Sequence, residues 1–166
     1  MFRSLVIILF SCLLLGSCVP SPYYQRQEAV PQNAWAYDFK PDFKFDITDT
    51  TALYNLYFLI NHTEAYPYSN IWLMVYTKEP GDTAFKRSRI EIPLAESNGK
   101  WMGRGMGELW QQQMRISPAD HPFIFKKGTY EIRIEQNMRV NPLPEVLHVG
   151  LRVEKAGNRS SSSQMK

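Results

Sequence analysis

Apolar and polar residues alternate along most of the chain, and this period of two restricts the fold more than any other feature of the sequence. The alternation is clear at residues 147–154 and at 130–135, where Tyr130, Ile132 and Ile134 alternate with charged residues. Successive side chains of a strand point to opposite faces, so such segments bury one face and expose the other. One buried face and one solvated face are typical of antiparallel sheets.

Further segments of this kind follow one another with turn residues between them. Residues 71–77 are apolar on both faces, which suits a central strand, whereas Pro93 has no amide donor and places its strand at an edge or an end. We expect about eight short strands, which predicts an antiparallel β-sandwich or a jelly-roll-like barrel. The expected strands lie near residues 35–40, 43–47, 54–60, 71–77, 90–94, 100–103, 130–135 and 147–153.

Residues 106–115, "MGELWQQQMR", are the only helical candidate. Leu109, Trp110, Gln113 and Met114 would share one face of a helix of about three turns. We therefore expect an all-β domain with at most one short helix. The glycines just before and within this segment lack the Lys-Ser/Thr ending of a phosphate-binding loop, so we interpret them as a tight connection over which Trp101 packs.

The first 17 residues have the layout of a secretory signal. A short start containing Arg3 is followed by an apolar stretch from Leu5 to Leu15 and by the small residues Gly16-Ser17. As a helix the stretch would rise only about 16 Å, too little to span a bilayer core. Leu15-Gly16-Ser17-Cys18 resembles the bacterial lipobox, which implies cleavage after Ser17 and lipidation of Cys18.

Cys18 would be the only cysteine of the mature chain, because Cys12 is removed with the signal. Its sulfur would be in a thioether, so we expect neither a disulfide nor a thiolate metal site, and no cofactor. Two or more acyl chains anchor a protein stably, so the lipid on Cys18 makes a membrane the first expected partner.

The mature chain divides into a tether, one domain and a tail. Residues 18–33 are proline-rich and without periodicity, which predicts a tether, and residues 157–166 are a serine-rich tail expected to be disordered. Residues 34–156 form the expected β-sandwich domain. The full chain has 19 Lys and Arg residues against 16 Asp and Glu residues, well interspersed, so we expect no nucleic-acid partner.

Two polar and aromatic stretches suggest contact surfaces. Tyr66 and Tyr68 flank a proline before Asn70. Tyrosines exposed on a loop would suit contacts with sugars or proteins, although these two would equally well close one end of the sandwich. Further along, alternation places Gln136 and Met138 inward and Arg139 outward. A buried Gln136 needs hydrogen-bond partners, which the "YSN" loop at residues 68–70 would supply. The tentative binding residues are Tyr66, Tyr68, Asn70, Trp101 and Arg139.

We expect no catalytic residues. The three histidines, His62, His121 and His148, have no metal-binding spacing, and His148 lies on the polar face of its strand. Asp46, Asp49 and Glu64 would be neighbours only if their strands paired as a hairpin, and two of them could then serve as the acid pair of a glycoside hydrolase.

Four blocks behind the lipobox carry a family resemblance. "YPYSNIWLMV", "GKWMGRGMGELW", "GTYEIRIEQNMR" and "LHVGLRVEK" resemble the gliding motility lipoprotein GldH family of Bacteroidota, over about Phe39 to Lys155. The resemblance implies an all-β fold, a link to gliding and the associated type IX secretion apparatus, and lipidation at Cys18. It carries over no catalytic residue.

The implied host suggests a location and a modification. The segment after Cys18 has no acid until Glu28, which in that phylum indicates a lipoprotein on the outer membrane that faces the periplasm rather than the cell surface. The "DTT" and "DTA" triplets resemble the O-glycosylation signal of these bacteria, with Thr50 and Thr83 as acceptors.

Three functions follow as hypotheses. The first is a non-enzymatic envelope lipoprotein that supports a gliding or secretion assembly through contacts with other envelope proteins. The alternative is a glycan-binding lipoprotein with Tyr66, Tyr68 and Trp101 as a stacking platform. The third is an unrecognised hydrolase that uses Asp46, Asp49 or Glu64.

Overall fold

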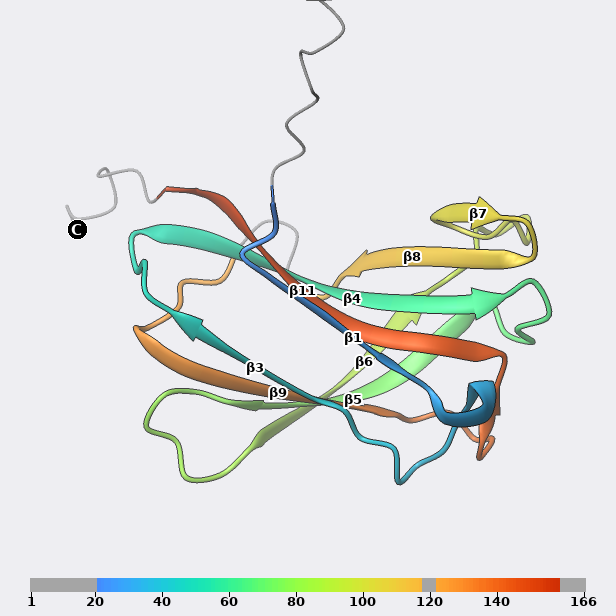
Figure 1. Ribbon diagram of the computed structural model, residues 1–166, viewed down its shortest axis with the longest axis horizontal. Helices are drawn as coiled ribbons and strands as arrows, with labels where there is room; N and C mark the ends of the chain where they lie inside the picture. The colour runs from blue at the N-terminus through green and yellow to red at the C-terminus, as the bar shows by residue number, and fades with distance from the viewer. Residues whose placement is uncertain (1–20, 118–121, 159–166) are drawn as a thin grey trace, which may run out of the picture.

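The structure, a computed structural model, describes residues 21–117 and 122–158. These residues form two packed sheets and one short 3-10 turn (Figure 1). None of the helices in these two ranges has the length and apolar character needed to cross a membrane. The elements are β1 (Tyr24–Ala29), η1 (Pro31–Asn33), β2 (Ala34–Trp35), β3 (Asp42–Ile47), β4 (Ala52–Thr63), β5 (Asn70–Lys78), β6 (Lys86–Pro93), β7 (Arg104–Met106), β8 (Leu109–Arg115), β9 (Gly128–Gln136), β10 (Leu143–Pro144) and β11 (Val146–Asn158).

Both sheets are antiparallel throughout. The five-stranded sheet has the order β1-β11-β4-β8-β7, the four-stranded sheet has the order β3-β9-β5-β6, and β10 pairs with β2 at one end. The chain crosses between the sheets several times, for example between β3 and β4, between β4 and β5 and between β6 and β7. The two sheets lie one over the other (Figure 1). The predicted all-β antiparallel sandwich is therefore confirmed.

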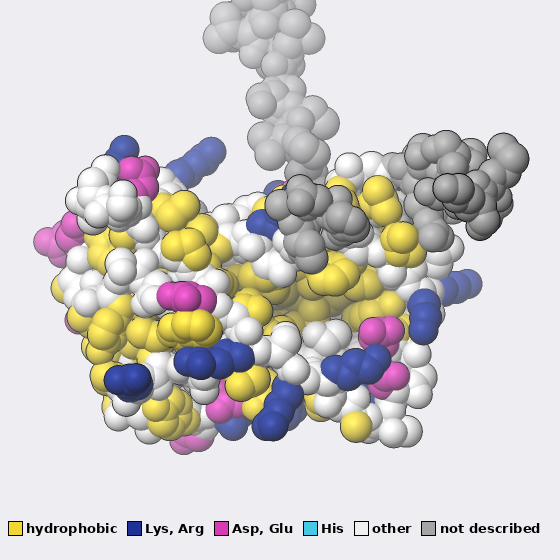
Figure 2. Space-filling model, turned by 180° about the vertical axis from the view of Figure 1, so that it is seen from behind, with side chains coloured by type: hydrophobic (Ala, Val, Ile, Leu, Met, Phe, Trp, Pro, Cys, Tyr) yellow, Lys and Arg dark blue, Asp and Glu magenta, His cyan; other side chains and the backbone are white. Residues whose placement is uncertain are grey.

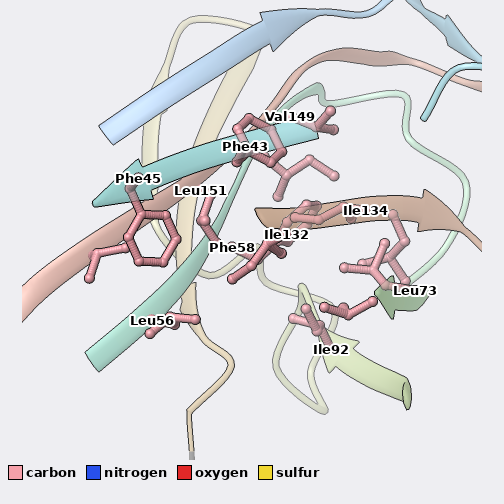
Figure 3. Packing of buried hydrophobic residues seen from close by; sticks show 14 of the residues in the cluster. Phe43, Phe45, Leu56, Phe58, Leu73, Ile92, Ile132, Ile134, Val149 and Leu151 are labelled. Carbon is pink, nitrogen blue, oxygen red and sulfur yellow. The ribbon is translucent and has the colours of Figure 1, made fainter. Parts of the chain in front are cut away.

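The core lies between the two sheets, where inward side chains of both interdigitate (Figure 3). Phe43 and Phe58 of facing sheets are fully buried, as are Ile132 and Ile134 of β9. Each such side chain contributes roughly 1.5–3 kcal/mol on leaving water. The burial of β9 follows the sequence alternation residue by residue, because Thr129, Glu131, Arg133 and Glu135 point away from the core.

The helix considered for residues 106–115 does not form, because Met106 ends β7 and residues 109–115 form β8. Strand β8 pairs with β4 along its whole length. Its inward positions are Trp110, Gln112 and Met114, and Gln112 is completely buried. Because Gln112, the central inward residue, is polar, the sequence of β8 does not show the apolar–polar alternation of a strand.

The predicted tether is too long. Residues 24–29 form β1, which pairs with β11, and Val30 is buried in the core. The polar sequence "YQRQEA" shows no alternation because an edge strand exposes much of both faces. At the other end β11 continues to Asn158, beyond the expected boundary at Ala156.

Two expected strands also differ from the structure. Residues 35–40 contribute only the short β2, which ends at Trp35, and residues 100–103 contribute a single bridge between Trp101 and Ala95. The signal peptide at residues 1–17, Cys18, His121 and residues 159–166 of the tail lie outside the described residues.

Candidate functional site

A groove on the outer face of the four-stranded sheet brings together three of the five tentative binding residues. The groove has a volume of about 410 Å³. We call it the Trp72 groove, and its lining residues are Tyr68, Asn70, Trp72, Arg89, Asn137, Met138 and Arg139.

Alternation along β5 places Trp72 in the groove. Ile71 and Leu73 are fully buried on the inner face, so Trp72 between them points outward. Strand β5 is flanked by β6 and β9, as expected for a strand that is apolar on both faces. The segment after β9 is held against Trp72, whose backbone N–H donates to the sulfur of Met138 at 3.2 Å and whose carbonyl accepts from the Asn137 N–H at 2.7 Å.

The groove carries positive charge beside an aromatic ring. The guanidinium carbon of Arg89 lies 4.0 Å from the centre of the Trp72 ring, a cation–π contact. Arg139 is exposed. Within residues 21–117 and 122–158, no acidic side chain forms an ion pair with Arg89 or Arg139. Glu91 lies nearby and accepts a hydrogen bond from the Asn70 side chain.

Gln136 supports the segment that carries Met138 and Arg139. Its side chain is fully buried, as predicted, and its Nε2 donates to the carbonyls of Trp35 at 3.3 Å and Val140 at 3.1 Å. Its Oε1 accepts from the Met138 N–H at 2.8 Å. The prediction that the "YSN" loop supplies these partners is wrong, because the partners come from β2 and from the segment after β9.

Tyr66 and Trp101 belong to an internal aromatic cluster and not to the groove. Tyr66 is only 3% exposed, and Trp101 is half-buried against His62 at 4.6 Å between ring centres. Tyr68 contacts the edge of Tyr66 and extends from this cluster to the groove. Because Tyr66 is buried and Trp101 is half-buried, the three rings do not form an exposed stacking platform.

His62 is the buried centre of that cluster. Its Nδ1 lies 2.8 Å from the Thr63 carbonyl, which can only accept, so Nδ1 carries the proton. Its Nε2 then accepts from Nε2 of Gln112 at 2.7 Å, and Gln112 also donates to the Leu94 carbonyl. Burial lowers the pKa of His62, which keeps the ring neutral. These contacts join the segment after β6 to β4 and β8, a structural role.

Of the three acids considered for hydrolysis, Glu64 lies at the opposite end of β4 from Asp49. Asp49 precedes β4 and Glu64 follows it, and a strand of 12 residues spans about 40 Å. Asp49 is bonded to Lys155 and Thr51, and the Lys155 ammonium holds the pKa of this carboxyl well below its usual range. Asp46 accepts from Thr129, and Glu64 accepts from the indole N–H of Trp110. Strands β3 and β4 lie in different sheets, so the supposed hairpin does not exist.

The predicted glycosylation sites and His148 lie outside the Trp72 groove. Thr50 and Thr83 are exposed in loops. His148, expected on the solvated face, is half-buried on β11, and its Nδ1 has no hydrogen-bond partner among the described residues. In the same part of the chain, no group of three or more His, Cys, Asp or Glu side chains is arranged to hold a metal ion.

Besides the Trp72 groove, the surface has an apolar hollow that reaches between the two sheets. Figure 2 shows hydrophobic side chains lining a recess across the middle of the molecule as seen from behind. A hollow of about 290 Å³ is lined by inward residues such as Leu56 and Ile132 and by residues 123–126. We assign no ligand to it, because residues 118–121, which adjoin this segment in the chain, lie outside the described residues.

Sequence reasoning missed Trp72 and Arg89. The available signal was the apolar outward half of residues 71–77, where Trp72, Met74 and Tyr76 face away from the core. By itself, that pattern predicts a central strand and not a binding surface. The approach of Arg89 and Arg139 to Trp72 depends on the pairing of β5 with both β6 and β9, which no local pattern specifies.

The chain is similar to proteins of one known family over most of its length. The family described as GldH lipoprotein matches residues 22–153. A gliding motility lipoprotein GldH homolog of Christiangramia forsetii is 28% identical over 93% of this chain and 97% of its own length. The gliding motility lipoprotein GldH of Flavobacterium johnsoniae is 28% identical over 89% of this chain and 94% of its own length.

Among solved structures, a non-crystalline cellulose specific carbohydrate-binding module, CBM28, is similar with a TM-score of 0.40 and 8% identity. The similarity covers 82% of this chain and 73% of that one. A likeness of this degree supports no functional inference.

Proposed function

The chain belongs to the GldH lipoprotein family, and from that premise we propose that it is a lipid-anchored, non-enzymatic envelope protein that supports gliding motility and the associated type IX secretion machinery by binding other envelope proteins. Two relatives that match almost the whole chain are named as gliding motility lipoproteins. The distance between Asp49 and Glu64 along β4, and the absence of a hairpin between β3 and β4, support a non-enzymatic role.

The observation that carries the protein-binding role is the composition of the Trp72 groove. Trp, Tyr, Met and Arg are the residues enriched in the centres of protein interfaces, and Trp, Tyr and Arg contribute most of the binding energy there. The groove combines Trp72 and Arg89 of the sheet with Tyr68, Met138 and Arg139 from the segments beside it. Since neither arginine has an ion-pair partner in the described structure, we propose that the occupant is an acidic segment of another envelope protein.

The proposed anchor would hold this surface near a membrane. Strand β1 begins at Tyr24, six residues after Cys18. Six extended residues reach at most about 20 Å. We propose that lipidated Cys18 keeps the domain within this distance of the outer membrane, on its periplasmic side.

Co-purification from the source organism tests the proposal. The tagged lipoprotein should recover an acidic partner protein, and Arg139→Glu should reduce the recovery because it reverses a charge in the groove. Arg87→Glu is the matched control, since Arg87 is also exposed on β6 but does not line the groove. Equal recovery from the two variants would contradict the groove as the binding surface. Cys18→Ala should release the protein from the membrane fraction, and retention there would contradict the anchor.

A further inference from the structure

The outer face of the five-stranded sheet, on the opposite side of the sandwich from the Trp72 groove, carries a second hollow that the proposed function does not use. Its volume is about 390 Å³. It spans all five strands from β1 to β7. We call it the glutamine strip and define it by Gln25, Gln27, Gln111, Gln113, Arg104 and Arg152, with Leu59 as an apolar element.

Strand pairing arranges these side chains in rows across the sheet. One row runs from Gln27 through Gly150 and Leu59 to Gln113. The row on one side of it ends at Gln111 and Arg104, and the row on the other side begins at Gln25 and Arg152. Neighbouring strands lie about 4.8 Å apart, so a row over four strands is about 14 Å long, which suits a short stretch of an extended polymer.

Gly150 leaves the middle of the strip without a protruding side chain. A Cβ atom at this position would lie 2.4 Å from the Arg26 carbonyl oxygen and 2.6 Å from Cγ of Gln27. Any other residue would push away the edge strand β1 or displace Gln27. The row is therefore a shallow trough with amide side chains at both ends and no side chain at Gly150.

Most of the amides in the strip are free to bind a ligand. Gln25 accepts a hydrogen bond from Arg152 at 2.7 Å. By contrast, the side chains of Gln27, Gln111 and Gln113 have no hydrogen-bond partner among the described residues. Each amide offers an acceptor oxygen and two N–H donors, which match hydroxyl groups that both donate and accept.

The strip lacks the features of a protein-binding surface. Leu59 is its one apolar lining residue, and it is 5% exposed, so no large aromatic or aliphatic anchor projects from the hollow. Protein interfaces depend on such anchors at their centres. A row of unpaired amides favours a hydroxyl-rich polymer over a polypeptide.

The charges of the strip indicate an acidic ligand. Arg152 forms an ion pair with Glu154, which offsets its charge. Arg104 is exposed and has no ion-pair partner in the described part of the chain, so an unbalanced positive charge lies at the β7 end. We propose that the glutamine strip binds an acidic polysaccharide, with its hydroxyls on the glutamines and a carboxylate or sulfate group at Arg104. This inference does not rest on protein binding at the Trp72 groove, which is a different surface.

Affinity electrophoresis of the mature lipoprotein in detergent tests the inference with three probes, namely polygalacturonate, chondroitin sulfate and the neutral glucan laminarin. At least one acidic polymer should retard the protein, and laminarin should not. Gln111→Ala with Gln113→Ala, and separately Arg104→Glu, should weaken binding roughly tenfold, the loss expected for hydrogen bonds to charged or polar ligand groups. Arg87→Glu on the other sheet should leave it unchanged. These are exposed positions, so unchanged thermal unfolding verifies that the variants fold.

Three results would overturn the inference. If laminarin bound as well as the acidic polymers, Arg104 would not select an acidic ligand. If none of the polymers retarded the protein, the strip would not bind polysaccharide. Full binding by the strip variants would place any binding elsewhere. Since these readouts contain no partner protein, they are independent of the co-purification that tests the Trp72 groove.

Discussion

Arg89 and Trp72 form a cation–π pair on the outer face of the four-stranded sheet, with 4.0 Å between the guanidinium carbon and the ring centre. The two residues come from neighbouring strands, β6 and β5, and the Met138 segment packs beside them. The ring is thus presented on a rigid platform, which lowers the entropy lost when a partner binds.

Trp72→Ala should weaken partner binding by at least about 2 kcal/mol, the cost typical of an aromatic residue at the centre of an interface. The ring is half-buried and its inward neighbours are unchanged, so the fold should persist. Titration of the purified lipoprotein with the partner recovered by co-purification measures the effect. Arg87→Glu serves again as the control, and an unchanged dissociation constant for Trp72→Ala would exclude the ring from the interface.

Gln136→Leu should lower the free energy of unfolding by about 2–4 kcal/mol, because it removes three hydrogen bonds to backbone groups of Trp35, Val140 and Met138, of which the bond to Trp35 is buried. The matched substitution Gln113→Leu, at an exposed position on β8, should change stability by no more than about 0.5 kcal/mol. Urea unfolding followed by tryptophan fluorescence compares the two. Similar stabilities of both variants would mean that the Gln136 bonds contribute little.

His62 should make the protein less stable in acid. Its pKa is lowered in the folded state from the ordinary value of 6.5, so the unfolded chain binds the proton more readily. The contribution of His62 is therefore complete above pH 6.5 and is lost as the pH falls from there toward the folded-state pKa. The melting temperature of His62→Gln should decrease less than that of the wild type between pH 7 and pH 5. A larger decrease in the variant would contradict the buried neutral ring.

Residues 24–29 should be required for a stable domain. Strand β1 covers one edge of β11, and Tyr24 packs against Phe45 of the other sheet. A fragment of residues 34–158 should therefore melt well below a fragment of residues 21–158, or aggregate through the exposed edge of β11. Calorimetry of the two fragments measures the difference. Equal melting temperatures of the two fragments would mean that β1 does not contribute to the stability of the domain.

The sequence predicted the sandwich because alternation survives wherever the inward residues are apolar, as in β9. It failed for β8, where Gln112 occupies an inward position and is satisfied by His62 and Leu94. It also failed for β1, an edge strand with polar residues on both faces. In both cases contacts with other strands stabilise a strand that its own sequence pattern does not indicate.

The candidate site was predicted only in part. Tyr68, Asn70 and Arg139 were identified from loop chemistry and alternation, and all three line the Trp72 groove. For Tyr66 and Trp101 the sequence leaves both a binding role and a packing role open, because an aromatic residue near a turn suits either. In the fold they pack around His62, a contact that depends on the crossing of the chain from β6 to β7.

Photo-crosslinking inside the source cells tests the central claim most directly. A photoreactive residue in place of Arg139 should capture an acidic envelope protein, whereas the same residue in place of Arg87 should yield mainly uncrosslinked lipoprotein. Capture of the same products from both positions, or of none from Arg139, would contradict a protein-binding role for the Trp72 groove.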